Sequence, residues 1–266
     1  MLLASWNINS VRIRLGILDL WIKKRNPEIF FLQEIKCEAI DFPYNFFKKL
    51  GYESYVFGQK GRNGVAIIVK KNIIEKEDTI NIDNLNIEGQ ARFIEYYSKK
   101  LEIYFCNIYA PNGNPISNHE KFNFKVKWYD NLKGYLSKHI KNEKKIIIAG
   151  DFNVLENEKD VKDFDNWSED ALGKLIIRKK FRKILGLGFT NIVRQYYEPG
   201  KIFSFWDYQK AAWQRNYGLL IDHILCSPNL LESIISFGSD HEMRGKERPS
   251  DHRSEERRVG KECRSR

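Results

Sequence analysis

Six short segments of the sequence pass from apolar residues into a carboxylate, amide, phenol or imidazole side chain. A single aspartate after an apolar run is more often a turn or cap residue than a catalytic one. Several such ends in one chain favour a shared site, because phosphodiester hydrolysis needs oxygen ligands for a hard cation, a group that positions water, and donors for the charge on phosphate. The segments cover residues 6–9, 32–36, 107–112, 150–153, 221–223 and 249–252.

The elements that must position these residues are short. Apolar runs of strand length occupy 2–7, 29–34, 103–107, 146–151 and 219–222, and helical spacing occupies 13–24, 122–139 and 170–185. Residues 64–69 with 73–82, and 92–97 with 101–108, are typical of antiparallel strand pairs joined by short turns. This alternation predicts a layered α/β sandwich with mixed sheets.

Length and composition favour one domain. The 266 residues are 42% hydrophobic, and no repeat or Pro/Gly/Ser-rich linker marks a boundary. No apolar run approaches the roughly 20 residues that span a bilayer, and no basic segment precedes the N-terminal apolar residues. We therefore expect no membrane association and a cytoplasmic location. Four cysteines without Cys-x-x-Cys pairing argue against a zinc knuckle or a disulfide framework.

The formal net charge of +10 favours a polyanionic partner such as nucleic acid. The chain is also rich in Lys, Ile and Asn, which have AT-rich codons, so genome composition could supply much of this charge. Charge alone therefore leaves DNA binding open.

The six segments, in this order, resemble the exodeoxyribonuclease III branch of the exonuclease–endonuclease–phosphatase superfamily over residues 1–252. The resemblance implies a single domain over 1–252 with a four-layer α/β sandwich, in which two mixed β-sheets pack face to face with helices on the outside. It also implies a monomeric, Mg²⁺-dependent DNA repair nuclease, with Mn²⁺ as a substitute. Its substrates would be double-stranded DNA with abasic sites, cleaved on the 5′ side, and 3′ ends. The residue types that the family requires stand at Asn7, Glu34, Tyr109, Asp151, Asn153, Asp222, Asp251 and His252.

The resemblance assigns the metal to Glu34 as principal ligand, with Asn7 and Asp251 nearby as direct or water-mediated ligands. Asp151, Asn153 and His252 complete the candidate metal set. Asp151 would activate or orient the attacking water, which requires either a raised pKa or metal-assisted ionisation of the water. The sequence leaves both routes open.

Three further residues would act on the phosphate. Asp222 and His252 resemble the family's carboxylate–imidazole pair, in which the acid orients the ring and favours its cationic form. Tyr109 would contact the scissile phosphate or stabilise the leaving oxygen. Asn153, besides its place in the metal set, would fix Asp151 or donate to phosphate.

The expected DNA contacts also rest on the resemblance. The aromatic loop 203–208 resembles the loop beside the abasic pocket, where Trp206 could pack against an extrahelical sugar. Leu220 departs from the family's usual basic residue, so one phosphate contact is expected to be missing. The complete set of candidate DNA contacts is Lys36, Arg62, Asn63, Asn112, Trp206 and His252.

Two rival functions share parts of this pattern. A superfamily phosphatase or phosphodiesterase acting on inositol or lipid phosphates would use the same Glu34, Asp151 and His252, but the aromatic loop and the positive charge favour DNA. A catalytically silent DNA-binding module would have no need for the water-activating Asp151. An assay of abasic duplex with and without Mg²⁺ discriminates among the three.

The last residues, 253–266, have no apolar period and do not resemble the family, whose members continue from Asp-His into a short apolar strand. They match, codon for codon, the translation of a common sequencing adapter. We therefore expect that the natural coding sequence is interrupted after His252, that 253–266 is an artefactual tail, and that the terminal strand is missing.

Overall fold

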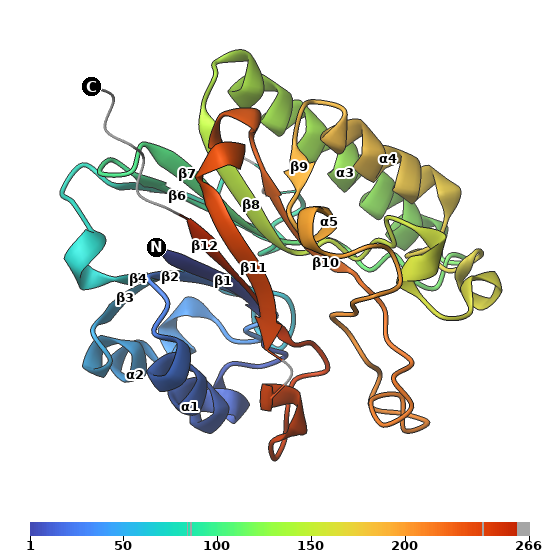
Figure 1. Cartoon of the computed structure of the whole chain (residues 1–266), viewed down its shortest axis with the longest axis horizontal. Helices are drawn as coiled ribbons and strands as arrows, with labels where there is room; N and C mark the ends of the chain where they lie inside the picture. The colour runs from blue at the N-terminus through green and yellow to red at the C-terminus, as the bar shows by residue number, and fades with distance from the viewer. Residues whose placement is uncertain (84, 86, 241, 260–266) are drawn as a thin grey trace.

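Two six-stranded mixed sheets lie face to face in the computed structural model, which describes residues 1–83, 85, 87–240 and 242–259 (Figure 1). The strand order is β11-β12-β1-β2-β4-β3 in the first sheet and β5-β6-β7-β8-β10-β9 in the second. β1 pairs in parallel with β2, and β7 with β8, whereas the other neighbours are antiparallel. The first sheet contains β1 (Leu2–Asn7), β2 (Ile29–Gln33), β3 (Tyr52–Phe57), β4 (Val65–Lys70), β11 (Ile234–Asp240) and β12 (Ser254–Val259), and the second contains β5 (Thr79–Asn81), β6 (Phe93–Ser98), β7 (Ile103–Tyr109), β8 (Lys145–Asp151), β9 (Thr190–Asn191) and β10 (Asp222–Cys226).

Alternating side chains of the strands build separate cores on the two faces of each sheet. In β4, Val65, Ile67 and Val69 join the core between the sheets, whereas Ala66 and Ile68 join the core under the helices of the first sheet. Because both faces of these strands are covered, the strands are nearly continuous apolar runs, which is why the sequence shows them clearly.

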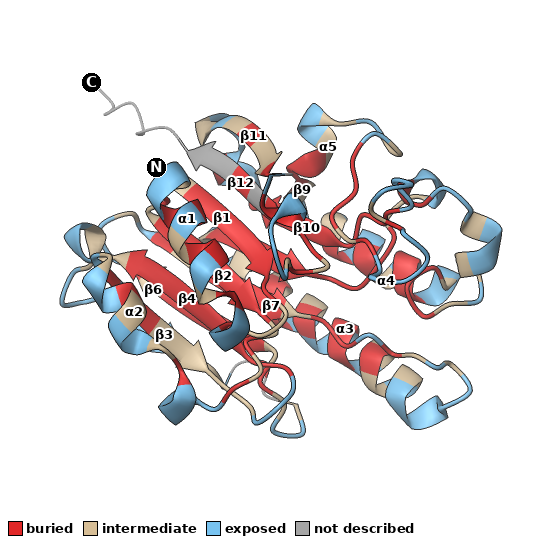
Figure 2. Cartoon of the chain, turned by 90° about the horizontal axis from the view of Figure 1, so that it is seen from below, coloured by how far each residue is buried: buried red, intermediate tan, exposed pale blue. Residues whose placement is uncertain are grey.

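Helices form the two outer layers. α1 (Leu15–Arg25) and α2 (Tyr44–Lys49) cover the first sheet, and α3 (His119–Lys141) and α4 (Leu175–Leu185) cover the second (Figure 1). Figure 2 shows the strands buried and the helices exposed on their outer sides. The predicted four-layer sandwich is confirmed. The shorter elements are α5 (Val193–Tyr196) and the 3-10 turns η1 (Arg12–Arg14), η2 (Ala39–Asp41), η3 (Lys71–Ile73), η4 (Glu158–Asp160), η5 (Phe164–Trp167), η6 (Pro228–Ser233) and η7 (Glu242–Gly245).

Two predicted strand pairs have different outcomes. Residues 92–97 and 101–108 form the antiparallel pair β6 and β7, as expected. The pair predicted between 64–69 and 73–82 is wrong, because β4 lies between β2 and β3 in the first sheet while β5 joins β6 in the second. Within the described part of the chain, no helix is long and apolar enough to cross a membrane.

A terminal strand is present, so the prediction that it is missing is wrong for this chain. β12 (Ser254–Val259) pairs antiparallel with β1 on one side and β11 on the other. The physical reason is that strand pairing uses backbone groups, which any residue except proline supplies. Glu256 is 8% exposed, and its carboxylate accepts a hydrogen bond from Trp21 and pairs with Arg25. The proposed adapter origin of 253–266 stays a prediction, and 260–266 lie outside the described residues.

Candidate active site

Strand ends from both sheets bring the predicted catalytic residues together. Asn7 ends β1, Glu34 directly follows β2, Tyr109 ends β7, and Asp151 ends β8 opposite Asp222, the first residue of β10. Parallel strands end at the same edge of a sheet, so β1 delivers Asn7 beside Glu34 and β7 delivers Tyr109 beside Asp151. Strand length places each side chain at a strand end, and the pairing of the strands within the two sheets brings these ends together.

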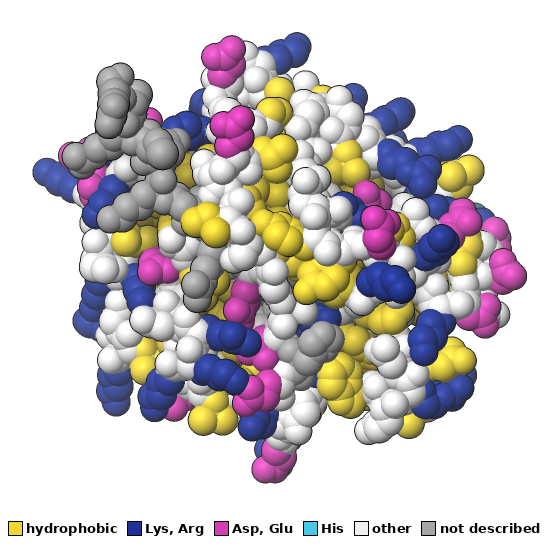
Figure 3. All heavy atoms as spheres, in the orientation of Figure 1, with side chains coloured by type: hydrophobic (Ala, Val, Ile, Leu, Met, Phe, Trp, Pro, Cys, Tyr) yellow, Lys and Arg dark blue, Asp and Glu magenta, His cyan; other side chains and the backbone are white. Residues whose placement is uncertain are grey.

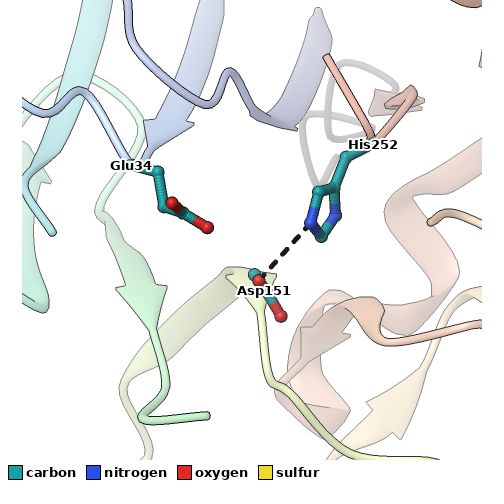
Figure 4. Close-up of side chains that lie close together, drawn as sticks. All are labelled: Glu34, Asp151 and His252. Carbon is teal, nitrogen blue, oxygen red and sulfur yellow. Dashed lines mark ion pairs between the residues drawn. The ribbon is translucent and has the colours of Figure 1, made fainter. Parts of the chain in front are cut away.

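A hydrogen-bonded cluster occupies this edge. The Asn7 Nδ2 group donates to Glu34 Oε1 at 2.9 Å and to Asp151 Oδ2 at 3.0 Å. Glu34, Asp151 and His252 point toward one another (Figure 4), and each offers one ligand atom within 4.8 Å of the others. In the described part of the chain, this is the one group of His, Cys, Asp or Glu residues close enough to hold a metal.

The His252 ring is held between two carboxylates. Its Nδ1 lies 2.7 Å from Asp222 Oδ2, and its Nε2 lies 3.8 Å from Asp151 Oδ2. Burial opposes the charge of the ring, but Asp222, with Asp151 and Asp251, raises the pKa of His252 to about 10. In its charged form the ring has no free lone pair and would be a donor to phosphate, while its predicted place among the metal ligands, beside Glu34 and Asp151, stays a prediction.

The two carboxylates of the cluster differ in proton affinity. Burial and the nearby charges of Asp222 and Glu34 raise the pKa of Asp151 to about 7, although His252 opposes this effect. Burial also disfavours the charge on Glu34, but Lys36, whose Nζ lies 2.8 Å from Glu34 Oε2, lowers the pKa of Glu34. Glu34 thus offers an ionised carboxylate, whereas Asp151 can exchange a proton near neutral pH.

The predicted amide residues lie beside Asp151. The backbone N–H of Asn153 donates to Asp151 Oδ1 at 2.8 Å, while its side chain donates to Ala110 O at 2.8 Å. Asn112 Nδ2 donates to Asn153 Oδ1 at 3.3 Å. Asn153 therefore orients Asp151 through its main chain, and its φ of 48° belongs to the left-handed region.

Asp251 lies outside the candidate metal group of Glu34, Asp151 and His252. Its Oδ1 accepts hydrogen bonds from Asn9 Nδ2 at 3.0 Å and Ser250 Oγ at 3.3 Å, and it is not in the Glu34 group. Lys36 Nζ in turn donates to Asn9 Oδ1 at 2.6 Å. Lys36, predicted to contact DNA, here pairs with Glu34, and Asn9 is a site residue that the sequence reasoning missed, although it lies in the polar segment 6–9.

Tyr109 packs beside the carboxylates. Burial, followed by the charges of Glu34 and Asp151, raises the pKa of Tyr109 well above its ordinary value, so the phenol keeps its proton. The Arg92 guanidinium lies 4.8 Å from the centre of the Tyr109 ring and donates to the Tyr109 carbonyl at 3.2 Å. Arg92 was missed because no motif surrounds it in the sequence.

Two hollows border the cluster. One, of about 370 Å³, brings together the predicted DNA contacts Arg62, Asn63 and Asn112 with Arg92 and Lys121. The other, also about 370 Å³, is lined by Phe205, Leu219, Trp167 and Arg215 among others. Phe205 contacts the His252 ring, with 5.0 Å between ring centres. Figure 3 shows Lys and Arg side chains spread over the face that it draws, with Asp and Glu side chains among them.

Trp206 does not line either hollow, which corrects its predicted DNA contact. The ring is 1% exposed and packs against Phe203 and Trp213. Phe205, the residue before Trp206, lines the hollow instead, because alternate side chains of an extended loop point to opposite sides. Leu220 also faces away from the site, in the core between the sheets, so its apolar character removes no phosphate contact here.

The match to known proteins agrees with this site. Residues 4–252 match the model of the endonuclease/exonuclease/phosphatase family. The chain therefore belongs to this family, as the motifs predicted, and it is a phosphodiesterase.

Within the family, the chain is similar to exodeoxyribonuclease III of Haemophilus influenzae, with 30% identity over 95% of this chain and 97% of the relative. A 3′-5′ exonuclease from Neisseria meningitidis has a TM-score of 0.90 at 30% identity, covering 98% of this chain and 100% of that one. An AP endonuclease from Archaeoglobus fulgidus has a TM-score of 0.88 at 32% identity, covering 97% and 99%.

Proposed function

We propose that the protein is a metal-dependent DNA repair nuclease that cleaves the phosphodiester bond 5′ to abasic sites and removes nucleotides from 3′ ends of duplex DNA. The observation that carries this proposal is the place of Asp151, a buried carboxylate between Asn7 and the His252–Asp222 pair. Relatives named exodeoxyribonuclease III and AP endonuclease support DNA as the substrate, as does a Neisseria homologue solved with a product DNA hairpin.

Mg²⁺ is the metal that we propose, with Mn²⁺ as a substitute. Glu34 and Asp151 fit such an ion because they offer hard oxygen atoms. The repulsion between the two carboxylates contributes to the raised pKa of Asp151, and a bound cation would relieve that repulsion. Asn7 would hold both carboxylates in place. When bound, the cation would supply neutralisation of phosphate charge and a lowered pKa for water.

The protein's own groups divide the remaining work. Asp151, oriented by the Asn153 N–H, would take the proton of the attacking water, whose own pKa would be lower beside a bound cation. His252, kept cationic by Asp222, would donate from Nε2 to a phosphate oxygen and stabilise the charge that grows there.

Two further types of donor surround the expected phosphate position. Tyr109 remains a phenol and would donate a hydrogen bond to the leaving oxygen. Asn112 and Asn153 would donate their amide groups to the non-bridging oxygens. The DNA strand would run from the polar hollow of Arg62 and Lys121 across this site to the hollow beside Phe205.

Cleavage of one labelled duplex with a central abasic analogue tests the proposal. We expect Mg²⁺-dependent incision 5′ to the analogue, with loss in EDTA and in the Asp151→Asn variant. An undamaged duplex with a recessed 3′ end measures the exonuclease activity in parallel. Preference for inositol phosphates over DNA would instead support the phosphatase rival. A monomeric state and a cytoplasmic location stay predictions.

A further inference from the structure

Lys125 of α3 is a fully buried lysine that the proposed reaction does not use directly; burial lowers the pKa of its side chain to about 7, although the charges of Asp170 and Asp151 oppose this effect. The residue is 0% exposed, and its Nζ donates to three backbone carbonyls: Asn112 O at 2.8 Å, Asn153 O at 2.7 Å and Ala171 O at 3.0 Å. An ammonium has three N–H donors, so these contacts satisfy all of them. The three carbonyls belong to three separate loops, after β7, after β8 and before α4.

The attachment of α3 to the sheet does not depend on this charge. Trp128, Tyr129 and Leu132 of the same helix are fully buried in the apolar core under the second sheet. Removing an ammonium from water is unfavourable by several kcal/mol unless its hydrogen bonds compensate. A buried lysine at this place therefore points to a role that an apolar side chain could not fill.

The loops joined by Lys125 carry the amides beside the reacting phosphate. Asn112 donates to Asn153, and the Asn153 N–H orients Asp151. Gly113 has a φ of 83°, and a Cβ at this residue would lie 2.6 Å from Lys125 Cδ, so the loop is folded closely around the lysine stem. The third carbonyl, that of Ala171, lies in a segment that Asn114 also ties to the same loop.

We propose that Lys125 is a positioning residue that fixes Asn112 and Asn153 relative to Asp151, and so sets the geometry of the phosphate donors. The inference rests on the proposed function. Losing these three hydrogen bonds would leave the two loops joined only by the weaker Asn112–Asn153 and Asn153–Ala110 contacts, and displacement of catalytic groups by about 1 Å can reduce a rate by roughly 100-fold. Substrate binding should fall less than the chemical step, because Lys125 bonds to Asn112 but not to Arg62 or Asn63 among the predicted DNA contacts of the hollow.

The test compares Lys125→Met with Leu132→Ala. The second variant changes the same helix but creates a cavity in the apolar core beneath it, away from the site. We expect Lys125→Met to lower kcat on abasic duplex by about 10- to 100-fold with a smaller change in KM, and Leu132→Ala to lower Tm but keep kcat. A double-mutant cycle with Asn153→Ala should be non-additive, because Lys125 acts through Asn153. Additive losses, or normal kcat in folded Lys125→Met, would overturn the proposal.

Hydrogen exchange supplies a measurement that does not depend on activity. Lys125→Met should increase exchange at 110–114 and 151–154, and Leu132→Ala should not. Unchanged exchange in these loops would overturn the positioning role even if the wild-type enzyme cleaves DNA, whereas an inactive wild type would overturn only the proposed function. If Lys125→Met does not fold, Lys125→Gln, which keeps a shorter donor, takes its place with the same expected pattern.

Discussion

Asp222 is the group that we expect to keep His252 positively charged during the reaction. The two side chains are 4% and 3% exposed, with 2.7 Å between Asp222 Oδ2 and His252 Nδ1. Asp222→Asn keeps the size of the side chain and one acceptor oxygen but removes the charge. The variant therefore separates the orientation of the ring from its ionisation.

The size of the effect follows from the pKa of His252. With Asp222 present, that pKa is about 10, so the ring is charged at every pH from 6 to 9. Burial lowers the pKa, and without Asp222 we expect a value near or below the ordinary one of about 6.5. At pH 7.5 a histidine of that pKa is about one-tenth protonated, so the rate should fall by roughly tenfold or more.

The assay is the ratio of variant to wild-type kcat between pH 6 and 8.5, read together with the wild-type profile because the charge of Asp222 also raises the pKa of Asp151. The ratio should rise as pH falls, because the variant regains the imidazolium. A raised folded pKa stabilises the fold fully below the unfolded value of about 6.5 and is lost as pH rises through about 10, so the Tm difference should shrink in that window. A pH-independent ratio, with Asp130→Asn on the exposed side of α3 as a surface control, would show that Asp222 only orients the ring.

Four further predictions use other parts of the structure. Glu34→Gln should raise the Mg²⁺ concentration for half-maximal cleavage by about tenfold or more in a metal titration, because an anionic ligand is lost. Arg62→Ala should reduce the slope of log DNA affinity against log salt by about 1 in fluorescence anisotropy, and an unchanged slope would remove Arg62 from the DNA path. Gly150→Ala should lower Tm by about 2 to 12 °C, since its Cβ would lie 2.0 Å from Ile108 O, whereas Gly134→Ala in α3 has open space and should not destabilise. Sequencing the source locus with unrelated adapters should find codons for a short apolar segment directly after the codon for His252. Finding the codons of 253–266 at that place in the locus would contradict their artefactual origin.

The strands that carry the site were predictable because burial on both faces leaves a continuous apolar run that stops at a polar residue. The predicted 2–7 and 146–151 agree with β1 and β8 within one residue at each end. Their convergence was predictable only through the resemblance. Strand length identifies where Asn7 and Asp151 end up along their strands, but not which sheet each strand joins, which explains the error for 73–82.

Residues recruited by packing left no signal in the sequence. Lys125 lies on a helix among other lysines, where the ordinary interpretation is a solvated side chain, and only the fold shows that it points at three loop carbonyls. The sequence predicted Trp206 at the site where the structure places Phe205, and this error also comes from packing that the sequence does not show. An aromatic loop predicts that some ring contacts the site, but the direction of each ring depends on the backbone path of the loop.

The terminal strand β12 shows that neighbouring strands can impose strand structure on a segment whose own side chains do not favour it. Residues 254–259 have no apolar alternation, yet the chain leaves His252 with the His252 carbonyl bonded to Trp6 Nε1 at 3.1 Å and enters the space between β1 and β11. Backbone groups find partners on both sides there, whatever the side chains are. The consequence is a buried Glu256 that depends on Arg25 and Trp21 for compensation. An apolar residue would need no such partners, which is the structural reason to expect that the natural continuation after His252 is apolar.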